Sequence, residues 1–388
     1  MTDRNVSKLN PGPSECLACH SDDLHRIDVP ADFPWVTSDV RPWIGVVSMA
    51  SCAECGLDQK ILTDDYLEQV TLVYDSYALY DIACATDHVV VRNGGFGTRS
   101  ATLILGLMDA GVSFPAMGTA LDYGCGKGAF LRAISDRLPA WSLVGADLTE
   151  TNRSDVEGIP GAEYVTIPKL EANRRFDLIS LIHVVEHLAN PAQVLVELAS
   201  MLTETGLIVI QVPRYETNPF DLVVFDHLSH FSGRSLRSLA TLAGLDVLFF
   251  SDNLISRELT LVAGLPRGLA NDDGPLASRE VESPVLAVDW LSVCRDLIQE
   301  LTTGPYPMGI LGTAVGALWL DRCADSTTAF FVDEAPGNAG RVFFGRPIVS
   351  PSQVPDGAQV LVPFRPEFSI PISARLEATG ISCHYPKG

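Results

Sequence analysis

The sequence predicts an α/β protein with a doubly wound parallel sheet at its centre, a small cysteine-rich module before it and a second αβ unit after it. From about residue 98 apolar strand patterns alternate with helical patterns, which is typical of a parallel sheet covered by helices. Two Cys-x-x-Cys pairs precede this region, and a shorter strand–helix–strand pattern follows it. The chain of 388 residues is also too long for one ordinary core.

We expect four parts in chain order. A metal-binding module over 1–63 leads to a helical connector or lid over 64–97, and the central domain follows over 98–265. The C-terminal domain covers 266–388. The segment 264–284 is rich in Gly, Pro and Asp and is expected to be a linker.

The composition restricts the class of partner. Lys and Arg total 27 against 48 Asp and Glu, so the formal net charge is −21 and no basic run is present. Nucleic-acid binding depends on clustered Lys and Arg, so we expect a small-molecule substrate. The polar residues 1–10 lack a secretory core, and the apolar stretch 308–320 is too short to span a bilayer. These features predict a cytoplasmic protein with no membrane contact, either a monomer or a homodimer.

The four N-terminal cysteines form two matched pairs, Cys16 with Cys19 and Cys52 with Cys55. Disulfides are rare in the cytoplasm, and two such pairs can place four thiolates in a tetrahedron around Zn²⁺. We expect a closed structural zinc site, with His20 as a weaker alternative ligand and a strand-rich loop between the pairs. Chance spacing of unrelated cysteines is the competing explanation.

The connector contains a helical pattern from Thr63 to about Cys84 that carries Tyr74, Tyr77 and Tyr80. The simpler interpretation is an amphipathic helix packed on the core. The alternative is a lid whose phenols face the substrate.

The remaining elements follow from periodicity. A helix is expected near 99–110, and a helix near 285–301 opens the C-terminal unit. Strands are expected near 119–123, 142–147, 163–167, 176–182 and 206–212 in the central domain, and the C-terminal unit continues with strand 308–311, helix 314–323 and strand 329–332.

The first central strand ends in an acid and three alternating glycines, Asp122-Tyr123-Gly124-Cys125-Gly126-Lys127-Gly128. Glycine permits positive φ and brings bare backbone close to a ligand, while a helix beginning near Lys127 would direct free N–H groups at the same place. The Gly-x-Gly-x-Gly spacing differs from the Gly-x-Gly-x-x-Gly of dinucleotide folds. It predicts a nucleoside cofactor.

A second acid, Asp147, ends the next strand, where a carboxylate can accept hydrogen bonds from both ribose hydroxyls. Either acid alone could be a helix cap, but strand, glycine loop, strand and acid together predict S-adenosylmethionine (SAM). The residues expected to hold SAM are Asp122, Tyr123, Gly124, Gly126, Asp147, Leu148 and His183.

His183 begins the pattern His-x-x-Glu-His with Glu186 and His187, which in some zinc proteases lies inside a long helix. Here it follows a strand, and Asn190-Pro191 starts a new helix soon afterwards, so we reject the protease interpretation. At the end of its strand His183 would border the methyl group of the cofactor. His187 is expected to be structural.

A last candidate is Asp226-His227, in a loop after the fifth strand. An imidazole beside an acid can act as a general base, and a solvated loop histidine is the alternative.

In this order the motifs resemble the SAM-dependent sugar C-methyltransferases of deoxysugar biosynthesis. The segment 226–232, Asp-His-Leu-Ser-His-Phe-Ser, is similar to Glu-His-Leu-Ser-Tyr-Phe-Ser of that family, and 309–314 and 332–338 are similar to its C-terminal segments. The resemblance covers nearly the whole chain. It implies an N-terminal zinc module, a class I methyltransferase domain and a C-terminal Rossmann-like domain.

The resemblance also implies a mechanism on a nucleotide-linked keto-deoxysugar. His227 would remove a proton beside the ketone, with Asp226 orienting the imidazole, and the enolate would attack the SAM methyl group in line. His183 and the three tyrosines would stabilise the enolate oxygen.

The chain departs from this family near the substrate. Val224 replaces a tyrosine, Arg257-Glu258 replaces a glycine pair, and Gly337-Asn338 lacks a following lysine. The identity of the sugar therefore does not follow. The glycines Gly309, Gly312 and Gly316 could contact the nucleotide sugar or could only permit close packing.

Two other functions compete. One is an O- or N-methyltransferase of another small metabolite, which needs a weaker base. The other is a zinc-ribbon binding protein with a relic methyltransferase fold, which the intact Asp122, Gly124, Gly126 and Asp147 disfavour.

Overall fold

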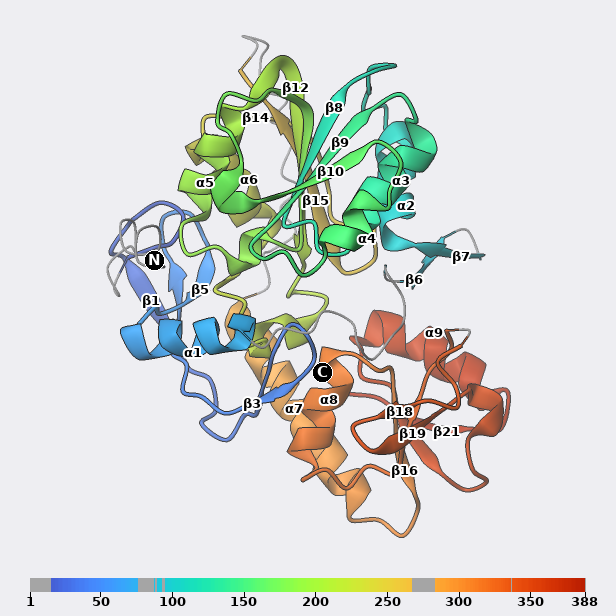
Figure 1. The fold of residues 1–388 in the computed structure, drawn as a ribbon. Helices are drawn as coiled ribbons and strands as arrows, with labels where there is room; N and C mark the ends of the chain where they lie inside the picture. The colour runs from blue at the N-terminus through green and yellow to red at the C-terminus, as the bar shows by residue number, and fades with distance from the viewer. Residues whose placement is uncertain are drawn as a thin grey trace.

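The computed structural model describes residues 15–75, 87, 89–92, 95–266, 283–335 and 337–387. Tyr77 and Tyr80 lie outside these residues, as does most of the expected linker. Figure 1 shows a central sheet with helices on both sides, an N-terminal module at its lower left and the C-terminal domain below the sheet at the right. Within the described part of the chain, no helix is long and apolar enough to cross a membrane.

The N-terminal module is a small antiparallel sheet, which agrees with the strand-rich loop expected between the cysteine pairs. Strand β4 (Met49–Cys52) pairs with β1 (Leu24–Ile27) on one side and β5 (Asp58–Lys60) on the other. A hairpin of β2 (Trp35–Val36) and β3 (Pro42–Trp43) extends from it.

Helix α1 (Asp64–Asp75) packs Tyr66, Val70 and Val73 into the core. The described part of α1 therefore agrees with the interpretation as an amphipathic helix packed on the core. A hairpin of β6 (Val89–Arg92) and β7 (Gly95–Thr98) then leads to α2 (Arg99–Asp109).

The central sheet has seven strands in the order β10-β9-β8-β11-β12-β15-β14. The five expected strands are confirmed and are parallel, whereas the last two were not predicted, and β15 runs antiparallel to both of its neighbours. The strands are β8 (Thr119–Tyr123), β9 (Ser142–Asp147), β10 (Ala162–Thr166), β11 (Phe176–Ile182), β12 (Leu202–Pro213), β14 (Asp246–Ser251) and β15 (Glu258–Gly264).

Helices cover both faces of this sheet, which confirms the doubly wound prediction. In Figure 1 α2, α3 (Ala129–Arg137) and α4 (Arg153–Glu157) lie on one side, and α5 (Pro191–Ala199) and α6 (Gly233–Leu242) lie on the other. Successive strand residues such as Leu178 and Ile179 belong to different buried clusters, one on each face. The 3-10 turns η1 (Ile167–Lys169), η2 (Val185–His187) and η3 (Pro219–Val223) connect these elements.

The C-terminal domain is a second αβ unit, as expected. Its sheet has the order β18-β19-β17-β16-β20-β21, parallel except for β18. Its elements are α7 (Pro284–Thr302), β16 (Met308–Leu311), α8 (Val315–Cys323), β17 (Phe330–Val332), β18 (Val342–Phe343), β19 (Arg346–Val349), η4 (Pro351–Gln353), β20 (Gln359–Leu361), α9 (Pro366–Glu377) and β21 (Ser382–His384).

Two of the C-terminal glycines are explained by packing. A Cβ atom on Gly309 would lie 2.2 Å from the ring of Phe330, and one on Gly316 would lie 2.7 Å from the ring of Phe220. Gly316 thus lets α8 approach η3 of the central domain. Gly312 has a φ of 101° and no such neighbour, so packing does not account for it.

The N-terminal module and the central domain share one sheet. Strand β13 (Ser229–His230), which follows His227, pairs with β5 and completes the order β1-β4-β5-β13. At the end of β5 the buried ammonium group of Lys60 donates to the carbonyl oxygens of Val224 and Phe225, the latter at 2.9 Å. The module therefore supports the loop that carries His227.

Replacing Lys60 with Met should remove a pH-dependent contribution to stability. Burial lowers the pKa of Lys60 to about 7, although Asp226 and Asp221 act in the opposite direction, and in the unfolded chain the pKa returns to about 10.4. Between these values the unfolded chain binds more protons, so this group makes the protein more stable as the pH rises. Relative to Lys60→Met, the wild type should gain up to about 1.4 kcal/mol of unfolding free energy per pH unit in this window.

Urea unfolding at several pH values between the two pKa values measures this difference. Lys169→Met is the matched control, because the Lys169 side chain is 73% exposed and pairs with Glu150 at the surface. Parallel pH profiles for the wild type and Lys60→Met would contradict the assignment.

Candidate functional site

The glycine loop lies at the carboxyl end of β8. Gly124, Gly126 and Gly128 have φ values of 77°, 48° and 75°, a region that side chains disfavour. A Cβ atom on Gly124 would lie 2.5 Å from the side chain of Val184, which follows the neighbouring strand β11. Helix α3 begins at Ala129, two residues after the expected start, and Gly128 is its N-cap. The loop thus brings bare glycine backbone to the edge of the sheet, where the N–H groups of Gly124 and Cys125 donate to the carbonyl oxygen of Ala146.

The two strand-ending acids flank this loop. Asp122 is buried and accepts a hydrogen bond from Ser180 Oγ at 2.7 Å, and burial raises its pKa to about 7. Asp147 accepts backbone hydrogen bonds from Gly126 at 2.8 Å and Leu148 at 2.7 Å. Each oxygen of Asp147 keeps a second lone pair, so the carboxylate can still accept hydroxyl groups.

The other expected cofactor residues lie at the same edge. Tyr123 is the last residue of β8 and is partly buried, and burial raises the pKa of its hydroxyl. Leu148 follows β9 and is 60% exposed, so its side chain is free to cover an apolar ligand surface. His183 follows β11 with a φ of 55°. The structure therefore brings the predicted cofactor residues together around the ends of β8, β9 and β11.

His183 is held between two carboxylates. Its Nδ1 lies 3.3 Å from Glu186, and its Nε2 lies 3.2 Å from Glu258, the first residue of β15. Burial and the nearby Arg99 oppose charge on this imidazole, but the two carboxylates outweigh them and raise its pKa to about 9. A positive charge therefore lies at the sheet edge at neutral pH.

His227 is oriented by Asp221, which corrects the expectation that Asp226 does so. Asp221 lies in η3, and its two oxygens are 2.6 Å from Nδ1 of His227 and 2.6 Å from Nδ1 of His230. Burial opposes charge on Asp221, but the two histidines keep its carboxyl pKa well below its ordinary value. An ionised carboxylate can only accept, so Nδ1 of His227 donates to Asp221 and Nε2 is the ring nitrogen left for another partner.

Asp226 holds the loop to the N-terminal module. Its carboxylate accepts hydrogen bonds from the backbone N–H and the hydroxyl of Ser38, which lies between β2 and β3. Its backbone carbonyl lies 2.9 Å from Nδ1 of His187, and the hydroxyl of Tyr74 lies 3.0 Å from the same nitrogen. Of the three tyrosines of the connector, Tyr74 thus contacts His187. Tyr77 and Tyr80 lie outside the described residues.

Sequence reasoning missed three residues of this site. Asp221, Glu258 and Lys60 face His227, His183 and the 224–226 backbone respectively. Asp221 lies six residues before His227, but neither periodicity nor a motif marked it. Glu258 was noted only as a departure from the family, and Arg257 beside it adopts a φ of 67°, where a glycine is unstrained.

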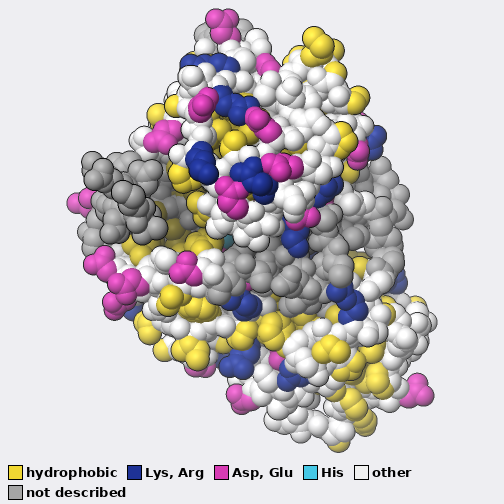
Figure 2. Space-filling view, in the orientation of Figure 1, with side chains coloured by type: hydrophobic (Ala, Val, Ile, Leu, Met, Phe, Trp, Pro, Cys, Tyr) yellow, Lys and Arg dark blue, Asp and Glu magenta, His cyan; other side chains and the backbone are white. Residues whose placement is uncertain are grey.

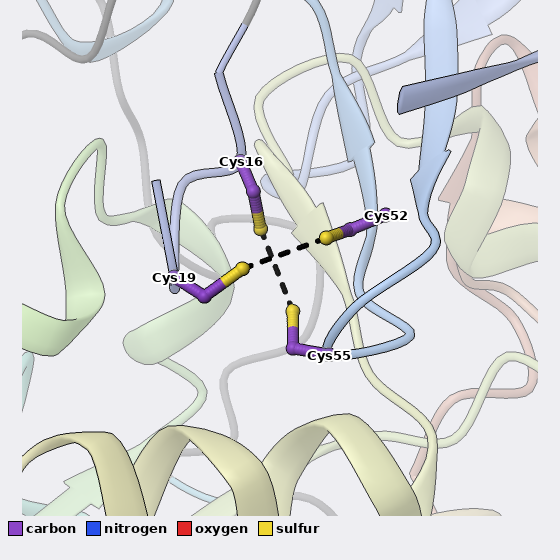
Figure 3. Close-up of side chains that lie close together, drawn as sticks. All are labelled: Cys16, Cys19, Cys52 and Cys55. Carbon is purple, nitrogen blue, oxygen red and sulfur yellow. Dashed lines mark hydrogen bonds between the residues drawn. The ribbon is translucent and has the colours of Figure 1, made fainter. Parts of the chain in front are cut away.

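The four cysteines of the N-terminal module point their sulfurs toward one another (Figure 3). The Sγ atoms of Cys16 and Cys55 are 3.5 Å apart, as are those of Cys19 and Cys52. Four sulfurs at 2.3 Å from a tetrahedral Zn²⁺ would be about 3.8 Å apart, so the donor set and its spacing fit zinc. A hydrogen bond from Cys55 lowers the pKa of Cys16 to about 5 despite burial. His20, the weaker alternative, is not part of this four-residue group.

Acidic and basic side chains mix on the face shown in Figure 2, where Lys and Arg do not form a continuous patch.

The sheet order, the glycine loop and the acids at the ends of β8 and β9 together define a SAM-dependent methyltransferase domain. In agreement with this, residues 98–248 match the methyltransferase domain family Methyltransf_23. The chain thus contains a methyltransferase domain, as the sequence predicted.

Solved structures match parts of the chain at low similarity. An O-methyltransferase family 2 protein from Planctomyces limnophilus, in complex with apigenin, is 17% identical, with a TM-score of 0.35 and coverage of 43% of this chain and 62% of that one. A SAM-dependent methyltransferase from Clostridium acetobutylicum is 14% identical, with a TM-score of 0.34 and coverage of 43% and 90%. An O-methyltransferase family protein from Burkholderia thailandensis is 18% identical, with a TM-score of 0.36 and coverage of 43% and 57%.

The chain thus spans less than two thirds of the first and third of these proteins, and the similarity indicates no substrate. A search of curated proteins found no significant match.

Replacing Gly124 with Ala should weaken SAM binding. The added methyl group would meet Val184 at 2.5 Å and strain a positive φ, so the loop must move away from the cofactor position. We expect at least about a tenfold loss of SAM affinity by calorimetry, equivalent to about 1.4 kcal/mol. Gly111→Ala is the control, because Gly111 has a φ of 86° but nothing within 4 Å of an added Cβ atom. Equal SAM affinities in the two variants would contradict the prediction.

Proposed function

We propose that this protein transfers the methyl group of SAM to a carbon atom of a nucleotide-linked keto-deoxysugar. The observation that carries the proposal is a pair of histidines with different carboxylate partners, one of which lies at the sheet edge that carries the glycine loop. His183 lies between Glu186 and Glu258, which hold it as a cation, whereas Nδ1 of His227 contacts Asp221 and leaves Nε2 as its second nitrogen. C-methylation needs both a base and a positive charge for the enolate.

The chemical steps follow from these roles. Nε2 of His227 takes the proton from the carbon beside the ketone, and the electrons of that C–H bond form the enolate. The imidazolium of His183 stabilises the enolate oxygen, and Tyr74, whose hydroxyl contacts His187, is a further candidate donor. The enolate carbon then bonds to the methyl carbon as the bond from methyl to sulfur breaks, leaving S-adenosylhomocysteine.

O- or N-methylation of another small metabolite is the alternative, since the Asp221–His227 pair could also deprotonate a hydroxyl or an amine. The third possibility, a zinc-ribbon binding protein with a relic fold, conflicts with the intact cofactor loop. The acidic composition, with a net charge of −21, supports a small molecule and not a nucleic acid as substrate. We also propose a cytoplasmic location and a monomer or homodimer.

His227→Ala should bind SAM normally but lose methyl transfer by about a hundredfold or more, because the base is removed. A panel of nucleotide-linked keto sugars with SAM, read by mass spectrometry, identifies a substrate. Loss of deuterium from the substrate carbon then separates C-methylation from O- or N-methylation. His25→Ala is the control, because the His25 side chain is 71% exposed. Methyl transfer at the wild-type rate in His227→Ala would refute the base assignment.

We further propose that the four N-terminal cysteines hold one structural Zn²⁺. Metal analysis should find about one zinc per chain, and Cys16→Ser should lose it, while Cys383→Ser in β21 should not. Without zinc, β5 loses its anchor and cannot support β13, so methyl transfer should fall while SAM binding persists. A zinc content near zero in the purified protein would overturn this proposal.

A further inference from the structure

We propose that Glu186, His187 and His227 form a second metal site, one that takes a transition metal such as Zn²⁺ or Co²⁺ and inhibits methyl transfer by occupying the base. The inhibition rests on the proposed role of His227, whereas the metal binding does not. The site is distinct from the four cysteines, which lie at the other end of the N-terminal sheet.

The three side chains offer a suitable set of donor atoms. One ligand atom from each lies within 4.8 Å of the others, and Glu186 and His227 are buried. The imidazole rings of His187 and His227 meet edge to face with their centroids 4.7 Å apart. Two imidazoles and one carboxylate are a common ligand set for first-row divalent metals.

The glutamate is available for a ligand bond. Glu186 is 1% exposed, and neither of its carboxylate oxygens has a hydrogen-bond partner within the described part of the chain. Oε1 lies 3.3 Å from Nδ1 of His183, whereas Oε2 makes no hydrogen bond within the described residues. A buried carboxylate oxygen without a partner is costly, and a cation would remove that cost.

The hydrogen-bond partners of Nδ1 in the two imidazoles determine which ring nitrogen remains for a metal. Nδ1 of His187 lies 2.9 Å from the carbonyl oxygen of Asp226, and Nδ1 of His227 lies 2.6 Å from Asp221. Both oxygens only accept hydrogen bonds, so each Nδ1 donates, and Nε2 is the nitrogen of each ring that is left to bind a metal. A histidine held by a carboxylate or a backbone carbonyl through its other nitrogen is typical of metal ligands.

The consequence for catalysis follows from the same atoms. Nε2 of His227 is the proposed base, and a metal bound there takes the lone pair that would accept the substrate proton. Imidazole and carboxylate donors favour Zn²⁺ and Co²⁺ over Mg²⁺, which prefers oxygen ligands and water. Inhibition should therefore be selective for transition metals and reversible by a chelator too weak to remove the cysteine-bound zinc.

Cobalt titration of the zinc-loaded protein tests the site directly. Co²⁺ should give weak visible bands without the sulfur-to-metal charge transfer that binding at the cysteines would produce. Glu186→Gln and His187→Gln should each weaken Co²⁺ binding at least about tenfold, and Asp221→Asn should weaken it about 10- to 100-fold through the loss of the support behind His227. His25→Asn, which changes an exposed histidine of β1, should leave it unchanged.

Each outcome has a distinct meaning. Co²⁺ affinity that is the same in the wild type, Glu186→Gln and His187→Gln would overturn the site. Cobalt binding that leaves methyl transfer unchanged, or accelerates it, would overturn the inhibitory role and show that His227 is not the base. Absence of methyl transfer to every keto sugar would refute the proposed function alone, because cobalt absorption is measured without substrate.

Discussion

The pairing of β5 with β13 is the contact on which the rest of the candidate site depends. It joins the N-terminal module, about sixty residues that include the four clustered cysteines, to the loop that carries His227. The amine of Lys60 and the hydroxyl of Tyr66 both donate to carbonyl oxygens of this loop, while its Asp226 carbonyl contacts His187 of the central domain. The proposed zinc would therefore act on the candidate site through an ordinary antiparallel ladder.

The two candidate catalytic histidines show how environment assigns different roles to the same side chain. His183 lies between the carboxylates of Glu186 and Glu258 and is charged. His227 contacts one carboxylate, that of Asp221, which it shares with His230. One imidazole can thus stabilise negative charge while the other accepts a proton. His183 lies near the glycine loop because β11 is the neighbour of β8, and His227 lies beside His187 of the turn that follows β11.

The sequence predicted the five parallel strands and most helices because their signals are local: buried apolar runs, helical periodicity and caps. It missed β14 and β15, which form an antiparallel pair without the helix that marks each parallel crossover. Strand β14 also has few buried residues, so its hydrophobic pattern is weak. The start of α3 differed from the expected position because Gly126 and Gly128 keep the intervening residues in the loop.

By itself the sequence determined the cofactor loop, the paired cysteines and the class of enzyme, since each depends on residues close together in the chain with a fixed spacing. Only the tertiary structure decided which carboxylates serve the histidines. Glu258 reaches His183 from a strand 75 positions later, and Lys60 reaches a loop 164 positions later. Whether Asp221 or Asp226 contacts Nδ1 of His227 depends on how the loop that carries His227 packs against β5. Side-chain direction in a loop follows from packing between distant segments, which spacing along the chain does not record.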